Sequence, residues 1–137
     1  MLALTKEEAV RRHRELWNEI AELCTESHFS SCGFSVFKIK SMALNALGYD
    51  DPIKFPDSMC WACEYAIYNA IYLRRTNKGI CICCFCPIKW KTELCYDNGG
   101  EYDMWRRYIQ DGNYEKTAEM ARVIANLPEK KEVKEND

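Results

Sequence analysis

The chain has 137 residues, 47% of them hydrophobic, so its length predicts one domain and its composition suffices for an ordinary core. Nineteen Lys and Arg against 21 Asp and Glu give a formal net charge of -2, which argues against nonspecific binding to phosphate backbones. The start of the chain turns charged by Lys6 and no apolar run nears the length of a membrane span, so we expect a cytoplasmic protein without a secretory signal.

The first third of the chain predicts two helices. Thr5 with Glu8 forms a capping box ahead of an amphipathic pattern, which predicts a helix over about Lys6–Ser27. Its apolar face carries Val10, Trp17, Ile20 and Cys24, and its outward face carries Lys6, Arg11, Arg12, Glu15 and Glu22. Small polar residues at 27–33 predict a loop, and 35–48 predicts a second helix that ends at Gly48.

The remainder predicts three more helices. A loop over 49–59, rich in proline and aspartate, leads to a buried third helix over 60–75. The stretch 80–90 predicts extended or turn-like backbone, because Pro87 and the β-branched isoleucines disfavour helix. After a glycine loop, two helices follow at 101–110 and 113–127, and Pro128 ends the last one. The charged segment 129–137 predicts a disordered tail after a single domain over 1–128.

Two Cys-x-x-Cys pairs are the main chemical feature of the chain. Cys60 with Cys63 and Cys83 with Cys86 give the spacing C-x2-C-x19-C-x2-C, which is typical of a tetrahedral four-thiolate zinc site. With four protein ligands no position remains for water, so the site is expected to be structural and to hold one Zn²⁺. The expected fold is mainly α, with about five helices around this zinc knuckle and little or no sheet.

The ligand set and the metal have alternatives. Cys81 and Cys84 form an interleaved pair of the same spacing, and spacing alone does not choose between the two frames. Cys95 could replace one ligand or pack beneath the knuckle. The Cys-Pro pair at 86–87 resembles the end of ferredoxin-type runs, which leaves an iron–sulfur cluster as the second reading. A further candidate site, spaced by four residues, comprises Cys24, His28 and Cys32.

No motif predicts catalysis. His13 and Glu15 with the Cys60 pair resemble the elements of zinc deaminases, but Met59 stands where that motif has proline and no predicted strand precedes the pair. His13 shares a helix face with Trp17, which favours a hydrogen-bonded core histidine. Metalloprotease, nucleophile-elbow, Walker and dinucleotide motifs do not occur, so we expect a protein that is not an enzyme.

Two kinds of partner can be considered from the side chains. Nucleic-acid contacts could come from the basic residues that flank the cysteine pairs, with Tyr72 and Trp90 available for stacking. These basic residues are Arg74, Arg75, Lys78, Lys89 and Lys91. Acidic neighbours such as Glu93 and Asp97 make a solvated rim the alternative. Four Trp, eight Tyr and five Phe favour a protein partner, although at least three Trp are expected in the core.

Five segments, HRELWNEIAEL, CWACEYA, CCFCPIKW, GGEYDMW and ARVIANLPEK, resemble in order the pattern of a group of small proteins encoded by phages and prophages of Firmicutes. The resemblance implies the ligands Cys60, Cys63, Cys83 and Cys86, followed by Trp90, whereas the additional Cys81 and Cys84 depart from that pattern. Small acidic phage proteins without catalysis often inhibit host systems, including as anti-CRISPR or other anti-defence proteins. The resemblance therefore implies stoichiometric binding to a host defence effector in the bacterial cytoplasm, with a zinc-finger-like nucleic-acid regulator as the alternative.

Overall fold

The computed structural model describes residues 5–27, 36–49, 61–67 and 86–131, with only the backbone described at positions 37, 63 and 64. These residues form five helices, α1 (Lys6–Leu23), α3 (Val36–Leu47), α4 (Trp61–Ile67), α5 (Glu101–Gln110) and α6 (Tyr114–Ala125). Within the described ranges the only β pairing is an isolated antiparallel bridge between Ile88 and Glu129. The predicted mainly α class is confirmed for this part of the chain.

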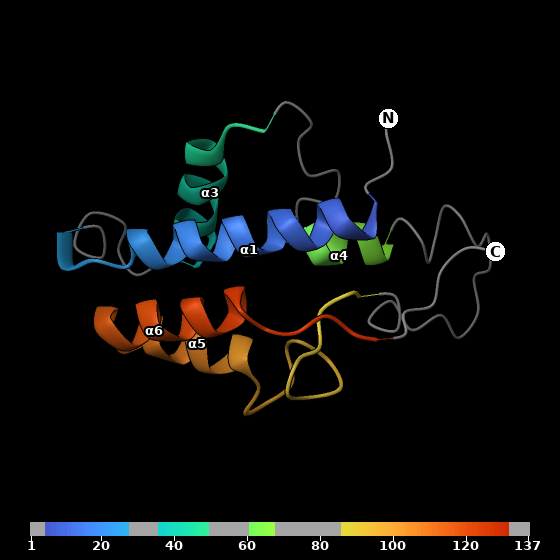
Figure 1. The fold of residues 1–137 in the computed structure, drawn as a ribbon. Helices are drawn as coiled ribbons and strands as arrows, with labels where there is room; N and C mark the ends of the chain where they lie inside the picture. Colours follow the sequence, from blue (N-terminus) through green and yellow to red (C-terminus); the bar gives the residue numbers. More distant parts are fainter. Residues whose placement is uncertain (1–4, 28–35, 50–60, 68–85, 132–137) are drawn as a thin grey trace.

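Helix α1 is the central element, and it packs against α3, α4 and α6. Figure 1 shows α1 along the middle of the molecule, with α5 and α6 forming a layer beneath it. The helix begins as predicted, because Thr5 Oγ1 accepts a hydrogen bond from Glu8 N at 3.1 Å. The predicted end at Ser27 was wrong: α1 ends at Leu23, and Cys24 N donates to the carbonyl of Ala21. The backbone leaves the helix at Cys24 and Thr25 and is helical again at 26 and 27, so the predicted helix is interrupted before Ser27.

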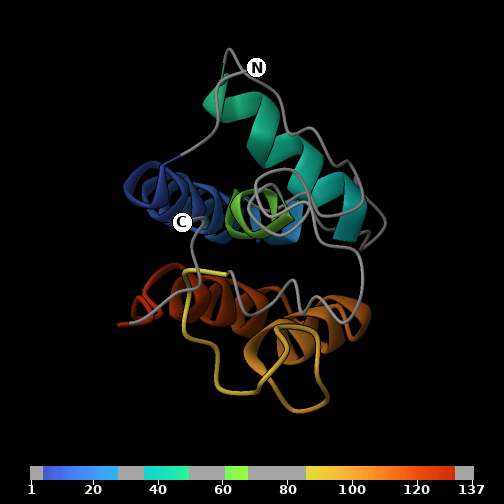
Figure 2. The same ribbon diagram turned by 90° about the vertical axis from the view of Figure 1, so that its right-hand side faces the viewer.

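Helix α3 crosses α1 on the side away from α5 and α6, as Figure 2 shows. Gly48 N donates to the carbonyl of Leu44 at 3.1 Å, and Gly48 has a φ of 61°. The predicted glycine stop is therefore confirmed, since the left-handed region favours glycine.

Helices α5 and α6 form an antiparallel hairpin. Gly112 turns the chain with a φ of 70°, and the side chain of Asn113 caps α6 by accepting from Lys116 N at 3.1 Å. The predicted bounds of α5 are confirmed, and α6 ends at Ala125, ahead of Pro128.

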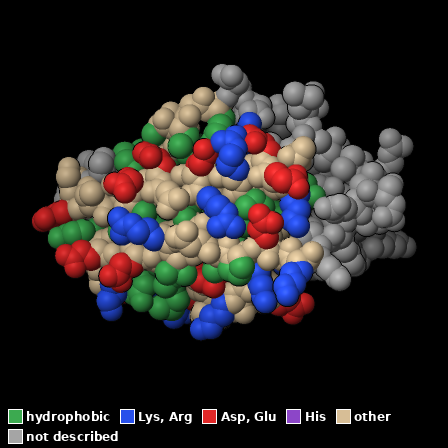
Figure 3. All heavy atoms as spheres, in the orientation of Figure 1, with side chains coloured by type: hydrophobic (Ala, Val, Ile, Leu, Met, Phe, Trp, Pro, Cys, Tyr) green, Lys and Arg blue, Asp and Glu red, His purple; other side chains and the backbone are tan. Residues whose placement is uncertain are grey.

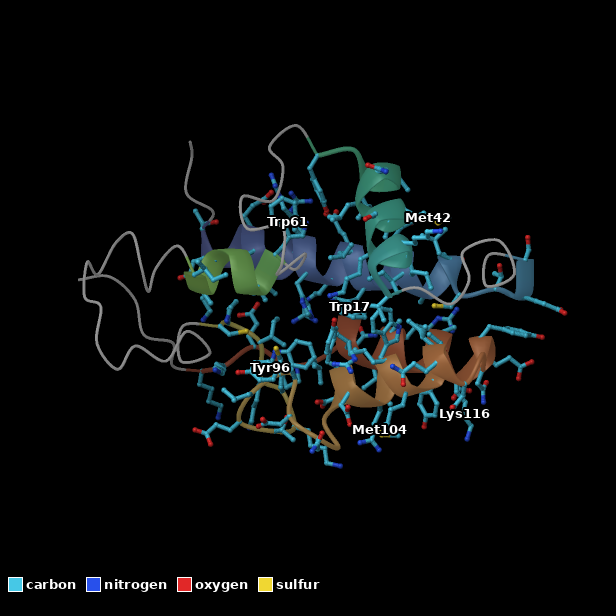
Figure 4. All side chains as sticks on the ribbon, turned by 180° about the vertical axis from the view of Figure 1, so that it is seen from behind. Trp17, Met42, Trp61, Tyr96, Met104 and Lys116 are labelled. Atoms are coloured by element: carbon cyan, nitrogen blue, oxygen red, sulfur yellow. The ribbon has the colours of Figure 1, made fainter. Side chains whose placement is uncertain are left out.

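The core is built around aromatic side chains between the two layers. Trp17, Trp61 and Trp105 are all buried, which confirms the expectation that at least three Trp lie in the core. The rings of Trp17 and Trp105 meet edge to face with centroids 4.8 Å apart. Figure 4 shows Trp17 between the layer of α1 and α3 and the layer of α5 and α6. The indoles thus join the helices to one another.

The segment after α6 returns to the cysteine-rich stretch. Lys89 N donates to the carbonyl of Pro128 at 2.8 Å, and Lys130 N donates to the carbonyl of Pro87 at 2.9 Å. Glu129 and Lys130, which composition assigns to the tail, therefore pair with the backbone just after Cys86. None of the helices in the described residues is long and apolar enough to cross a bilayer.

Candidate metal centre and its surroundings

The structure describes part of the predicted zinc site. Cys60 and Cys83, and the alternative ligands Cys81 and Cys84, lie outside the described residues. Cys63 lies in α4, where only its backbone is described, and Cys86 is described in full. His28 and Cys32 of the second candidate site also lie outside the described ranges. Among the described residues no three His, Cys, Asp or Glu side chains come together as a metal-binding group.

Helix α4 carries the first cysteine pair into the core. It begins at Trp61, directly after Cys60, and confirms the predicted third helix as far as Ile67. Trp61, Ala62, Tyr65 and Ala66 are buried along one side of the helix, as expected of a buried helix, and Ile67 is half-buried.

Cys86 lies against the same core. Its side chain is 5% exposed, and it belongs to one buried cluster with Trp61, Ala62 and Ile88. Figure 2 shows the segment that starts at residue 86 beginning below the edge of α4 and running from there beneath α1. Residues 86–90 form no helix, as predicted from Pro87 and the isoleucines. Cys86 and the start of α4 therefore belong to the same core, which draws residues from all five helices.

Cys95 lies in a different setting, on the loop 91–100. Two hydrogen bonds hold the loop: Leu94 N donates to Asp97 Oδ2 at 2.9 Å within it, and Gly99 N donates to Asp103 Oδ2 of α5 at 3.0 Å. The Cys95 side chain is half-buried there. The same loop presents Tyr96, which is 59% exposed (Figure 4).

Cys24 is a buried thiol in the core cluster, as expected for a structural cysteine. Burial raises its pKa to about 12, and an opposing hydrogen-bonding interaction with Trp105 is too weak to cancel this. The thiolate is the reactive form of cysteine, so Cys24 is inert as a nucleophile at neutral pH.

His13 is a core residue, as predicted. Its Nε2 lies 3.0 Å from the carbonyl oxygen of Ile124, and its ring meets Trp90 edge to face with centroids 5.9 Å apart. Glu15, the other member of the deaminase-like motif, instead accepts hydrogen bonds from Arg11 and Tyr49. The two side chains, although both on α1, therefore have separate partners.

Arg12 departs from the prediction that it points into solvent. Its guanidinium carbon lies 4.5 Å from the ring centroid of Tyr49 and 4.6 Å from that of Trp61. The Arg12 side chain is 12% exposed, and its Nε donates to Glu8 at 2.8 Å. Hydrogen bonds from Arg11 and Arg12 lower the pKa of Glu8. Helical periodicity could not reveal these contacts, because both rings come from other segments.

Lys40, in α3, is a second buried cation that the sequence did not indicate. Only 5% of the residue is exposed, and Nζ donates to Tyr102 Oη at 3.0 Å. Nζ also lies over the rings of Tyr102 and Trp17, 4.6 and 5.8 Å from their centroids. The ammonium therefore contacts one hydroxyl and two aromatic faces.

The predicted nucleic-acid contacts are described only in part. Arg74, Arg75 and Lys78 lie outside the described residues, whereas Lys89 and Lys91 are exposed. The Glu101 carboxylate accepts from the backbone N of Lys91 at 3.0 Å. Figure 3 shows basic and acidic side chains interspersed over the visible face, without a large area of one sign.

Comparisons of the chain with protein-family models, with curated proteins and with solved structures give no match.

Proposed function

We propose that the protein is a zinc-stabilised binding module that acts stoichiometrically on another protein. One structural Zn²⁺ would be held by Cys60, Cys63, Cys83 and Cys86. The observation that supports this most directly is the burial of Cys86 in one cluster with Trp61 and Ala62 of α4. Four thiolates leave no open coordination position, so the ion would stabilise the fold and supply no activated water.

Binding to a protein is favoured over binding to nucleic acid by the distribution of charge. The net charge is -2, and both signs are mixed on the visible face. The large hydrophobic side chain that the described surface exposes most is Tyr96, on a loop braced by hydrogen bonds of Asp97 and Asp103. A held, exposed aromatic side chain contributes to protein interfaces at little cost in conformational entropy.

The proposed target is a defence effector of a bacterial host, inhibited by occupation of its surface. This target follows from the resemblance to small phage proteins of Firmicutes. The test is to express the protein in a bacterium with an active CRISPR or other defence system and to count plaques of a phage that the system restricts. Plaque formation restored by the wild type and lost in Cys86→Ser supports the proposal, and unchanged restriction across a panel of defence systems contradicts it.

The second candidate function is a nucleic-acid-binding regulator. The observation that favours it is the exposure of Lys89 and Lys91 on either side of the half-buried Trp90. Binding of labelled DNA and RNA at rising salt separates the candidates, because phosphate contacts weaken steeply with salt whereas an apolar protein interface does not. Binding to the effector that persists at high salt, without DNA or RNA binding, excludes the regulator.

A further inference from the structure

We propose that Arg12 is a positioning residue for the first cysteine pair of the metal site. Its guanidinium lies over Trp61, which stands between Cys60 and Cys63 in the sequence. The inference rests on the proposed zinc site, and it adds a residue of α1 that sets how tightly the ion is held.

Three segments meet at the Arg12 guanidinium. The ring of Tyr49, just after α3, and the ring of Trp61, at the start of α4, lie at nearly equal distances from its central carbon, 4.5 and 4.6 Å. The two rings also contact each other, with centroids 5.1 Å apart and planes at 82°. Figure 4 shows Trp61 where α4 lies against α1. One cation on α1 therefore holds both other segments.

The surroundings of Arg12 differ from those of the neighbouring Arg11. Both arginines form an ion pair with Glu8. The side chain of Arg11 is 54% exposed and extends to Glu8 and Glu15, whereas that of Arg12 is 12% exposed and covers aromatic rings. A cation–π contact strengthens when the cation is removed from water, so the contact of Arg12 is the stronger restraint.

Trp61 is the first residue of α4. With its ring fixed by Arg12 and Tyr49, α4 cannot rotate about its own axis without breaking both contacts. The backbone that carries Cys63 is thereby restrained. Neighbours that orient metal ligands raise affinity because less ordering remains for the metal to impose.

The test measures zinc affinity by competition with a chromogenic chelator, using the full chain. Arg12→Ala is expected to weaken zinc binding about tenfold, the low end for residues that support metal ligands. Arg11→Ala removes a guanidinium from the same helix and the same Glu8 but touches no ring, so its zinc affinity should equal that of the wild type. Arg12→Gln keeps most of the side chain without the charge. Its zinc affinity is measured in place of that of Arg12→Ala if Arg12→Ala does not fold.

Cobalt(II) spectra and a matched core variant separate positioning from loss of stability. The visible bands of tetrahedral cobalt should shift in the Arg12 variants, because the ligands are held less closely. Ile109→Val, at a fully buried position of α5, lowers stability away from the site and should leave zinc affinity and spectrum unchanged. Arg12 variants that bind zinc as Arg11→Ala does, or an equal loss in Ile109→Val, would overturn the inference and leave the zinc site standing. Absence of zinc binding in the wild type would instead refute the proposed function.

Discussion

His13 on α1 donates a hydrogen bond from Nε2 to the backbone carbonyl of Ile124 near the end of α6, at 3.0 Å. The carbonyl can only accept, so Nε2 carries the proton. Arg14 Nη1 donates to the next carbonyl, that of Ala125, at 3.5 Å. Both groups add hydrogen bonds to carbonyls in the last turn of α6, where Ile124 O also accepts from Leu127 N at 3.3 Å. The first helix of the chain therefore caps the last one.

Replacing His13 with Ala should lower the free energy of unfolding by about 3 kcal/mol, through loss of a buried hydrogen bond and the cavity left by the ring. Arg14→Ala should cost less than about 1 kcal/mol, because its bond is long and its side chain is partly exposed. Urea unfolding followed by circular dichroism measures both. Equal losses of unfolding free energy in the two variants would contradict the larger contribution assigned to the His13–Ile124 hydrogen bond.

Some features of helix α1 could be predicted from the sequence pattern and others could not. Its start and the core position of His13 were predicted, because a cap and an apolar stripe are local signals. Arg12 was placed on the solvent face, since periodicity treats a charged residue as exposed. Its stem and planar head instead cover two rings that belong to other segments, which only the tertiary fold brings near.

The candidate metal site shows a different limit. Cysteine spacing indicated the ligand type and number, because two residues between thiols suit coordination of one ion. It could not choose between the Cys83–Cys86 and Cys81–Cys84 frames, since both have the same spacing. Nor could it indicate that Cys86 shares its buried cluster with α4, which depends on packing between distant segments.

Lys40 provides a test of buried charge. No carboxylate among the described residues forms an ion pair with it, and its ammonium contacts Tyr102 and Trp17. Lys40→Met keeps most of the volume and removes the charge, so the free energy of unfolding should be unchanged or rise by about 1 kcal/mol. Lys40→Ala should lower it by about 2 kcal/mol through the cavity. Thermal and urea unfolding measure both, and a Met variant as unstable as the Ala variant would mean that the ammonium itself stabilises the fold.

Stability should fall at alkaline pH. Burial raises the pKa of Cys24 to about 12 in the folded chain, against about 8.5 for an unfolded cysteine. The protonated Cys24 thiol therefore contributes its full stabilisation below about pH 8.5. This stabilisation is lost as pH rises toward 12, by up to about 1.4 kcal/mol per pH unit. Burial and Glu15 raise the pKa of Tyr49, which adds in the same direction above about pH 10.

Urea unfolding between pH 7.5 and 10.5 checks this dependence. In Cys24→Ala the free energy of unfolding should fall less between pH 9 and 10.5 than in the wild type. In Tyr49→Phe the difference from the wild type should appear only near pH 10.5. Parallel pH profiles for the wild type and Cys24→Ala would contradict the assignment. In native protein at pH 8, iodoacetamide should leave Cys24 unlabelled, as peptide mass spectrometry can show.

The segment after α6 should stabilise the stretch that follows Cys86. Deleting residues 128–137 removes the two backbone bonds to Pro87 and Lys89, which flank the buried Ile88, so the free energy of unfolding should fall by about 2 kcal/mol. Deleting only 132–137 keeps both bonds and should change it by less than about 0.5 kcal/mol. Equal stability of the two truncated chains would show that the bridge contributes nothing.

Cys86 and Cys24 form a matched pair for testing the metal. Both thiols are buried, 5% and 4% exposed, and both belong to the core cluster, but only Cys86 lies in a Cys-x-x-Cys pair. Cys86→Ser should lose zinc and most of the stability, since metal binding at a structural site is coupled to folding. Cys24→Ser should keep about one zinc per chain and lose about 1–2 kcal/mol from a buried hydroxyl. Elemental mass spectrometry and thermal unfolding of both variants decide the matter, because equal metal content in the two would exclude Cys86 as a ligand.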